Sequence, residues 1–389
     1  MRNHPFRAFT RFGTVAAAAT VAILAIATSA QAAVTTASAT PQKMPTFNGG
    51  VYAMAYDGNT IYVGGSFTQV NSASTKSARG GLAAINAQTG ALLPWAPKVN
   101  GKVDAMAVDP ATHGVYIGGA FSTVNGTGRD SLAEINGATG ALDAFKHTIS
   151  GSPEALSVGH GLLYLGGQFS SVDSKTRANL AAFTLSTGVL STTWAPTADD
   201  VVYAITSDTN RIYLGGKFHK INSISSTSKL AAVSPTTGAR DATFMPSLQI
   251  LVYAIAIGPN GIFAAEGGQG GRAIEYSTTG APIWTFTTDG DAHALAYLNG
   301  VLYVGGHFDH ACKSAVTGVK GLCIDGSFPR VKLAAVDATN GALLPWNPTG
   351  NGIHGVFAMA ANPTLGTVAA SGEFTTIQGV SRGRFAQFH

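Results

Sequence analysis

The chain repeats one short phrase at intervals of roughly 50 residues: a large residue, an apolar residue, two glycines, a variable residue and a phenylalanine. The copies stand at 62–67, 116–121, 164–169, 213–218 and 303–308, with a degenerate copy at 368–374. A fixed period of this size is typical of stacked or circular arrays of one small unit. Features that recur in each unit are therefore expected to be architectural, and features that break the pattern are candidates for function.

Each unit is predicted to contain four short strands. The first is clearest at 51–55, and a tight turn over 57–59 separates it from the second strand, which carries the Gly-Gly pair. The third carries Leu-Ala-Ala, as at 82–84, and the fourth segment is rich in Pro, as at 93–97, which favours an outer edge. Short strands with regular turns and no helical periodicity predict an all-β fold, and four strands per unit favour a β-propeller.

The number of first strands predicts seven blades. They begin near residues 51, 103, 153, 202, 252, 292 and 356, and six blades is the alternative if the weak fifth unit is misread. The last unit ends at its third strand, over 385–388, while segment 44–49 resembles the segment that precedes other first strands. An N-terminal strand is therefore expected to complete the last blade and close the ring.

The Gly-Gly pair is expected where the backbones of converging blades approach closely. Residues 64–71 read Gly-Gly-x-Phe-x-x-Val-Asn, and residues 118–125 repeat this phrase. Together with the Leu-Ala-Ala strand, the phrase resembles the kelch diglycine and, more closely, the delta-60 repeats of secreted bacterial propellers. The resemblance covers nearly all of the chain after residue 43 and implies a repeat architecture, but it brings no catalytic motif or substrate.

The first 32 residues have the pattern of a Sec-type signal peptide. Arg2, Arg7 and Arg11 precede an apolar stretch over 15–27, and Ala30-Gln31-Ala32 is a small-x-small cleavage site. The apolar stretch is too short to favour a membrane span, and no second one follows. We therefore expect a secreted, extracellular protein without a membrane span, with a flexible lead-in over 33–43 and one propeller domain over 44–389.

The charge pattern argues against nucleic acid as a partner. The formal charge is +4, and it falls to about +1 without the three arginines of the signal peptide, with no basic cluster left. No phosphate-binding loop or His-Glu-x-x-His motif occurs, and we predict no cofactor.

Cys312 and Cys323 flank an insertion in the sixth unit. In an exported protein the expected state of such a pair is a disulfide that closes the loop. The alternative is a zinc site that adds His307 and His310 to the two cysteines. The loop is expected either to overhang one face as a contact element or to be an insertion without function.

Two recurring features are expected to be structural. An Arg precedes the third strand at 79, 129, 177, 330 and 382, and copies spread around a ring cannot all serve one site, so we expect them to bond carbonyls or aromatics between blades. The segments around Trp95, Trp194 and Trp346 are also expected to be structural, with sugar stacking at the outer rim as the alternative.

The position before the recurring Ala of each first strand varies most in chemistry. It is occupied by Tyr52, Asp104, Glu154, Tyr203, Tyr253, His293 and Phe357. Because the first strand of a propeller blade is innermost, these side chains are expected to ring one mouth of the axial channel. Aromatic, acidic and imidazole groups there form a candidate site for a sugar or a cationic peptide. The alternative is that they only fill the channel.

The fifth unit departs most from the repeat. Ala264-Ala265 is interpreted as the replacement of Gly-Gly, the Phe is lost, and the loop is shorter. The shortening could open a docking groove beside the sixth-unit loop, and decay of the repeat is the other interpretation.

These features predict a secreted, non-catalytic binding scaffold for extracellular glycan, cell-wall polymer or, in second place, protein partners. The alternative is a secreted hydrolase or lyase acting on polysaccharide, with Asp104, Glu154 and His293 as acid–base groups at the channel mouth. An adhesive matrix protein without a small ligand is a third possibility.

Overall fold

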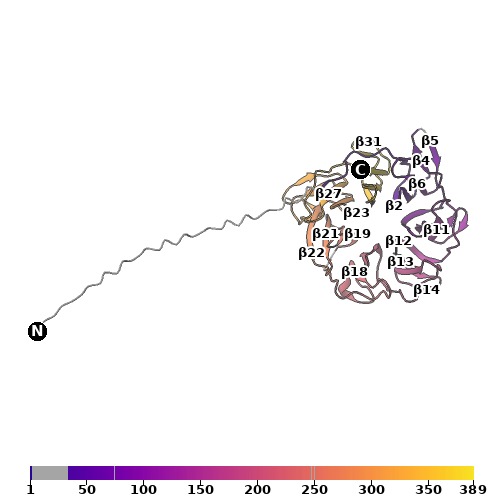
Figure 1. Ribbon diagram of the computed structural model, residues 1–389, viewed down its shortest axis with the longest axis horizontal. Coiled ribbons are helices and arrows are strands. Elements are labelled where there is room, and N and C mark those ends of the chain that lie inside the picture. Colours follow the sequence, from indigo (N-terminus) through magenta and orange to yellow (C-terminus); the bar gives the residue numbers. More distant parts are fainter. Residues whose placement is uncertain (2–33, 74, 247, 249) are drawn as a thin grey trace. The chain divides into compact units, whose positions relative to one another are not determined.

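Each repeat of the sequence folds into its own small antiparallel sheet. The computed structural model describes residues 34–389 apart from 74, 247 and 249, together with Met1. The signal peptide expected over 1–32 therefore lies, beyond Met1, outside the described residues. Within Val34–His389 the sheets follow one another around a common axis (Figure 1). No helix in this described part is long and apolar enough to span a bilayer.

Three strands recur in each sheet. The first strands are β2 (Val51–Asp57), β7 (Lys102–Val108), β12 (Ile149–Gly159), β16 (Val202–Ser207), β19 (Val252–Ile257), β23 (Ala292–Leu298) and β28 (Val356–Asn362). The second strands are β3 (Thr60–Gly65), β8 (Gly114–Ala120), β13 (Leu162–Val172), β17 (Ile212–Gly216), β20 (Gly261–Glu266), β24 (Val301–Gly306) and β29 (Thr367–Gly372). The third strands are β6 (Leu82–Asn86), β11 (Leu132–Asn136), β15 (Leu180–Thr184), β18 (Leu230–Val233), β21 (Gly271–Ser277), β27 (Leu333–Asp337) and β32 (Phe385–Phe388). In each sheet the second strand pairs with both others.

Short additional strands lie outside the three strands of each unit. They are β1 (Thr46–Phe47), β4 (Gln69–Ser72), β5 (Thr75–Ala78), β9 (Thr123–Val124), β10 (Thr127–Gly128), β14 (Lys175–Thr176), β25 (His310–Cys312), β26 (Ser327–Pro329), β30 (Thr376–Ile377) and β31 (Val380–Ser381). Three small sheets are separate, namely β1 with β4 and β5, β9 with β10, and β30 with β31, whereas β14 pairs with β13 and β25 and β26 extend the sheet of the fifth unit. Two 3₁₀ turns, η1 (Ser225–Thr227) and η2 (Val319–Gly321), complete the described secondary structure.

The expected fourth strand is regular only in the fifth unit, where β22 (Pro282–Thr288) pairs with β21. In five other units the fourth segment makes a single bridge to the third strand, as Leu92 does with Ile85. In the first unit Pro94 and Pro97 cannot donate the ladder hydrogen bonds that a longer strand needs. The second unit, which has no proline over 141–148, also makes only one bridge, so proline accounts for part of this correction.

The first strands are neighbours in chain order, from β2 to β28, and β28 also neighbours β2. The apolar core lies between adjacent sheets. One buried cluster joins Tyr62 and Leu82 of the first sheet to Val103 and Ile117 of the second. The recurring Phe, such as Phe67 and Phe121, is buried in these clusters, as the sequence predicted.

The Gly-Gly pair is required for two different reasons. A Cβ added at the first glycine would meet the neighbouring sheet: at Gly64 it would lie 2.6 Å from Val103 Cγ1. A Cβ added at the second would collide with the sheet's own first strand, at Gly65 with the carbonyl oxygen of Gly50. The glycines are therefore at close contacts, as expected, but the contact with the neighbouring sheet is to a side chain and the backbone contact lies within one unit, which corrects the expected approach of backbones between blades.

The second glycine lies opposite a β-bulge that recurs in each first strand. In β2 the register shifts between Val51 and Ala53, so Tyr52 has no partner of its own across the ladder. The same shift occurs at the equivalent position of the other first strands. A bulge adds one residue to a strand and turns its side chain in a new direction. The bulge therefore determines where the side chain before the recurring Ala, such as that of Tyr52, points.

The fifth unit needs one correction. The register pairs Ala254 with Ala265 and Val252 with Glu266, so Ala265-Glu266, and not Ala264-Ala265, occupies the Gly-Gly positions. Glu266 is fully buried and accepts a hydrogen bond of 2.8 Å from the Tyr276 hydroxyl. Burial raises its pKa to about 7.

The cysteines form the predicted disulfide, Cys312–Cys323, so their thiolates do not serve a zinc site. The loop that they close packs on the fifth unit: β25 pairs with β22, and Lys320 N donates to Gln269 Oε1 at 3.0 Å. It therefore occupies the place where the shortened fifth unit was expected to open a docking groove.

The recurring arginines bond carbonyl groups, as predicted, but mostly within one unit. Arg79 Nη2 donates to the Leu93 carbonyl at 3.0 Å, and Arg177 Nη2 to the Ser191 carbonyl at 2.9 Å. Each arginine thus fixes the Pro-rich fourth segment to its own sheet in place of ladder hydrogen bonds.

The N-terminal segment lies against the last sheet. Gln42 N donates to the Gln387 carbonyl at 2.8 Å, as Leu93 N does to the Ala84 carbonyl in the first unit. Ser38 N donates to the His389 carbonyl at 2.9 Å. These contacts hold part of the expected lead-in on β32, in the position of a fourth segment.

We expect the substitution Gly65→Ala to lower the free energy of unfolding by about 1–3 kcal/mol or more, because the new Cβ collides with backbone. Thermal and urea unfolding measure this effect. Gly128→Ala is the matched control, since nothing lies within 4 Å of its added Cβ and Gly128 does not have positive φ. Equal stability of the two variants would contradict the close approach.

Replacing both Cys312 and Cys323 with Ser should lower the free energy of unfolding by about 2–3 kcal/mol, because the unfolded chain gains the freedom of an open loop. Unfolding of the wild type with and without reductant provides the comparison. A fully titratable thiol content in the non-reduced wild type would contradict the disulfide.

Candidate functional site

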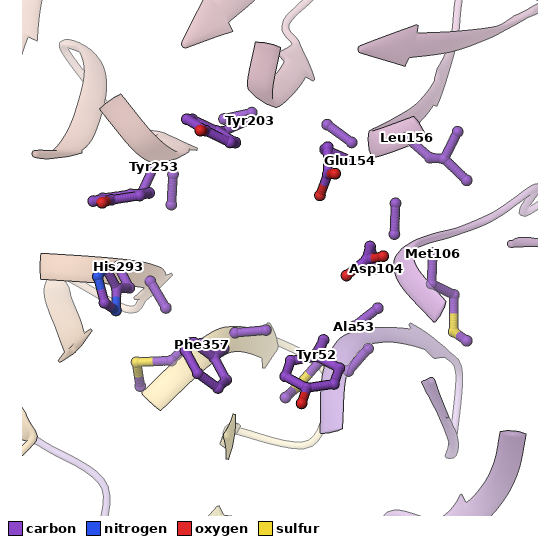
Figure 2. Close-up of a pocket in the computed structure, with 18 of the residues that line it drawn as sticks. Tyr52, Ala53, Asp104, Met106, Glu154, Leu156, Tyr203, Tyr253, His293 and Phe357 are labelled. Carbon is purple, nitrogen blue, oxygen red and sulfur yellow. The ribbon is translucent and has the colours of Figure 1, made fainter. Parts of the chain in front are cut away.

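The seven side chains that precede the recurring Ala line one pocket. Tyr52, Asp104, Glu154, Tyr203, Tyr253, His293 and Phe357 surround a cavity of about 280 Å³, and each comes from a different first strand. Figure 2 shows them around one opening, with Asp104 and Glu154 facing His293 across it. The structure thus brings together the whole predicted set, which we call the mouth ring.

The residues that follow the mouth ring along each first strand also line the pocket. They are the recurring alanine, such as Ala53, and the apolar residue after it, such as Met106 or Leu156. The side chains of Met106 and Leu156 pack in the apolar clusters between sheets, and Figure 2 shows them directed away from the opening. The mouth ring therefore supplies the polar and aromatic side chains of the pocket.

One side of the mouth ring is acidic. Lys102 Nζ lies 2.5 Å from Asp104 Oδ1, and the same ammonium lies 4.3 Å from the centroid of the Tyr52 ring. The Asp104 side chain is only 10% exposed, whereas Lys102 is about half exposed. Asp104 is thus paired with a cation that solvent can still reach.

Glu154 lies next to Asp104 but has no cationic partner of its own within salt-bridge distance in the described chain. Burial, and then the negative charge of Asp104, raise the pKa of Glu154 to about 7, while Lys102 partly offsets this. The two carboxyl groups therefore lie in unequal environments, because Asp104 is ion-paired with Lys102 and Glu154 is not.

The other side is aromatic. The rings of Tyr203 and Tyr253 lie 5.7 Å apart, Tyr253 and His293 4.6 Å apart, and His293 and Phe357 6.2 Å apart. Burial raises the pKa of Tyr253 to about 12, so its hydroxyl is neutral and able to donate. This side offers ring faces and hydrogen-bond donors, which suit sugar rings or cations.

Asp291 lies beside His293 at this side. Its Oδ2 lies 3.7 Å from His293 Nε2, and its Oδ1 accepts a hydrogen bond of 2.8 Å from Gly268 N. Burial would raise the pKa of Asp291, but the nearby imidazole of His293, the hydrogen bond from Gly268 N and the nearby His307 outweigh it and lower the pKa. His293 Nδ1 is buried without a hydrogen-bond partner in the described chain.

Sequence reasoning missed Lys102 and Asp291, which each lie two positions before a mouth-ring residue. Their spacing, Lys102 to Asp104 and Asp291 to His293, would have been a usable signal, because residues i and i+2 of a strand share a face. The lysine and the aspartate each occur at this position in one unit only. The repeat pattern therefore did not mark them as candidate site residues.

The mouth ring as a whole can bind a neutral polar or cationic group. Its acidic side accepts hydrogen bonds or positive charge, and its aromatic side stacks. An acid with a pKa near 7 beside an ionised carboxylate is also the arrangement that general acid–base catalysis uses.

Comparisons with known proteins identify the fold only. No protein-family model matches the chain, and no curated protein matches it either. Among solved structures the chain is similar to the WD40 β-propeller domain of Doa1, with a TM-score of 0.58 and 11% identity, over 90% of this chain and 96% of that chain. The predicted all-β propeller fold is therefore confirmed at the level of the fold.

The raised pKa of Glu154 predicts a pH dependence of stability. Between its unfolded value of about 4.3 and its folded value of about 7, only the folded state holds the proton, so stability falls as pH rises through this window. The variant Glu154→Gln should lack this fall, and its melting temperature relative to wild type should increase from pH 4.5 to 7 and then level off. Parallel melting curves across this range would contradict the buried acid.

Proposed function

We propose that this chain is a secreted, seven-bladed β-propeller of the delta-60, kelch-like type, which acts as a non-catalytic binding scaffold for extracellular glycan or cell-wall polymer. The propeller domain follows a cleaved signal peptide over 1–32. It comprises residues 44–389 together with Ser38 and Gln42 of the expected lead-in over 33–43, which contact β32. Its ligand enters the pocket inside the mouth ring. Protein partners are the second class of ligand.

The neighbour relations of the first strands support seven blades and a closed ring. β28 neighbours β2 as closely as consecutive first strands neighbour one another. The contacts of Ser38 and Gln42 with β32 support closure by the N-terminal segment, which supplies the fourth segment that the last unit lacks. Closure of this kind protects the sheet edge at the junction.

Secretion is supported by the disulfide and by the pattern of the first 32 residues. Disulfides persist in oxidising compartments outside the cytosol, and Cys312–Cys323 is formed. The low charged content, 11% of residues, favours a covering of Ser, Thr, Gly and Asn.

The observation that carries the proposal is the chemistry of the mouth ring. One pocket combines two carboxyl groups, three tyrosines, an imidazole and a phenylalanine on seven rigid strands. Sugar sites need hydrogen-bond acceptors beside ring faces, and rigid strands hold both without ordering cost.

A second candidate function is hydrolysis or lyase cleavage of polysaccharide, with Asp104, Glu154 and His293 at the reacting bond. The pKa of Glu154, raised to about 7, favours it as the acid. Against this, Lys102 Nζ lies 2.5 Å from Asp104 Oδ1. This carboxylate oxygen is therefore already paired and is not free to act on a substrate. We therefore place binding first.

We expect Asp104→Asn and Glu154→Gln each to weaken glycan binding about 10-fold or more, because each removes a hydrogen bond to a charged or buried group. Isothermal titration of the chain from residue 34 onward, against soluble glycans and cell-wall fractions, measures this, with product analysis on each ligand that binds.

Asp325→Asn is the matched control, since Asp325 is an exposed acid on the sixth-unit loop. Binding without released products, lost in the two mouth variants and kept in the control, is the expected result. Released products that disappear in Glu154→Gln would establish the enzymatic alternative, and unchanged binding in both variants would overturn the mouth ring as the site.

A further inference from the structure

We use the word seam for the interface between two neighbouring sheets. At the seam between the second and third sheets, several residues differ from those at the equivalent positions of the other units. In four other units a tryptophan of the fourth segment closes the seam: Trp95 Nε1, for example, donates to the Asn136 carbonyl at 3.0 Å, and Trp194 Nε1 to the Ser234 carbonyl at 3.1 Å. In the fourth unit Phe244 stands at this position. At the seam in question Phe145 takes this place and has no N–H to donate. His147 stands where the other segments have proline, such as Pro97.

A third deviation lies on the neighbouring strand. Glu134 of β11 pairs with Tyr116, at the position where β6, β15, β18 and β27 all have alanine opposite tyrosine. Tyr62 and Tyr164 bond the next unit, Tyr62 through a 2.9 Å hydrogen bond to the Gly137 carbonyl. Tyr116 instead faces Glu134, whose charge raises the pKa of the tyrosine beyond the effect of burial.

A fourth deviation orients His147. Asp173 stands where other units have asparagine, and its Oδ1 keeps the role of that residue by accepting a hydrogen bond from Thr148 N at 3.0 Å. Its additional oxygen, Oδ2, lies 2.7 Å from His147 Nδ1. The imidazole is 12% exposed and packs on Phe183 and Phe145, with ring centroids 4.1 and 4.5 Å away. Because Nδ1 faces a carboxylate, Nε2 of the neutral ring is an acceptor.

Two adjoining hollows open at this seam. One, of about 470 Å³, is lined by Glu134, Asp143, Phe145 and His147. The other, of about 640 Å³, shares His147 and Gly188 with the first. It is lined by the apolar residues Val189, Leu190 and Ala195 and by the charged residues Asp173, Lys175 and Arg177, of which Lys175 is exposed and Arg177 bonds the Ser191 carbonyl. The positions that depart from the repeat therefore surround one cavity system, away from the mouth ring.

The groups in the first hollow are mainly acceptors. Burial, and then the charge of Asp143, raise the pKa of Glu134, so a bound cation would relieve this repulsion. Lys146, the cation among the lining residues, is exposed to solvent. No group of three His, Cys, Asp or Glu side chains in the described residues is placed to hold a metal ion, which leaves an organic cation.

We propose that this seam is a second ligand site, which takes the side chain of a lysine from a peptide segment of a protein partner. The ammonium group offers three donors to Glu134, Asp143 and His147 Nε2. The apolar stem and adjacent peptide lie along Val189 and Leu190 in the second hollow. This site is independent of the glycan site at the mouth ring.

The test uses chemical-shift titration of the chain from residue 34 onward with a short lysine peptide, its Nζ-acetylated counterpart and glucosamine. We expect the lysine peptide to bind, and the acetylated peptide, which lacks the charge, to bind at least 10-fold more weakly. Glucosamine has an ammonium without an apolar stem and should also bind at least 10-fold more weakly. No response to the lysine peptide, or an equal response to the acetylated one, would overturn the proposal.

Variants that restore the repeat locate the site. Glu134→Ala installs the residue that the other third strands carry, so the chain should fold with an unchanged or higher melting temperature and lose lysine binding at least 10-fold. The double variant Phe145→Trp, His147→Pro should also fold with an unchanged or higher melting temperature and lose lysine binding at least 10-fold. The control Asp325→Asn should bind the lysine peptide as the wild type does.

The mouth ring is also acidic, so the peptide has a second place to bind. Loss of lysine binding in Asp104→Asn with full binding in Glu134→Ala would assign the peptide to the mouth and overturn the seam site. That result would leave glycan binding at the mouth to be decided by its own titration.

Discussion

The close approach of each first strand to the second glycine of the next strand is the constraint on which the rest of the structure depends. A Cβ at this glycine would collide with backbone, as at Gly65 and Gly50. Because the glycine is there, the first strand can carry a bulge at the following residue. Because of the bulge, that residue has no ladder partner and its side chain enters the central pocket. The architecture and the candidate site are thus consequences of one local contact.

This dependence explains how a repetitive scaffold presents a non-repetitive surface. The bulge fixes where the side chain lies but does not restrict its chemistry, so tyrosine, aspartate, glutamate, histidine and phenylalanine all occur there. The fifth unit has the same bulge without a glycine at this position. Glu266 stands at the second glycine position, yet Tyr253 still reaches the pocket, and the buried carboxyl group is accommodated by a hydrogen bond from Tyr276.

The sequence was sufficient to predict the fold, close contacts at the glycines and all members of the mouth ring, since each recurs with a fixed offset. It was not sufficient for the fourth strand, because in most units that segment makes only a single bridge, such as Leu92 with Ile85, which proline explains in part. The partners Lys102 and Asp291 lie outside the repeated phrase. The seam site was missed because Glu134, His147 and Asp173 are far apart in the chain and meet only when two sheets pack.

The central claim, that ligands bind within the mouth ring, is tested most directly by carboxyl footprinting of the chain with and without a glycan that binds. The account predicts that Asp104 and Glu154 lose labelling in the complex, while Glu134 at the seam and the exposed Asp325 label as before. Unchanged labelling of Asp104 and Glu154, with protection elsewhere on the propeller, would contradict it.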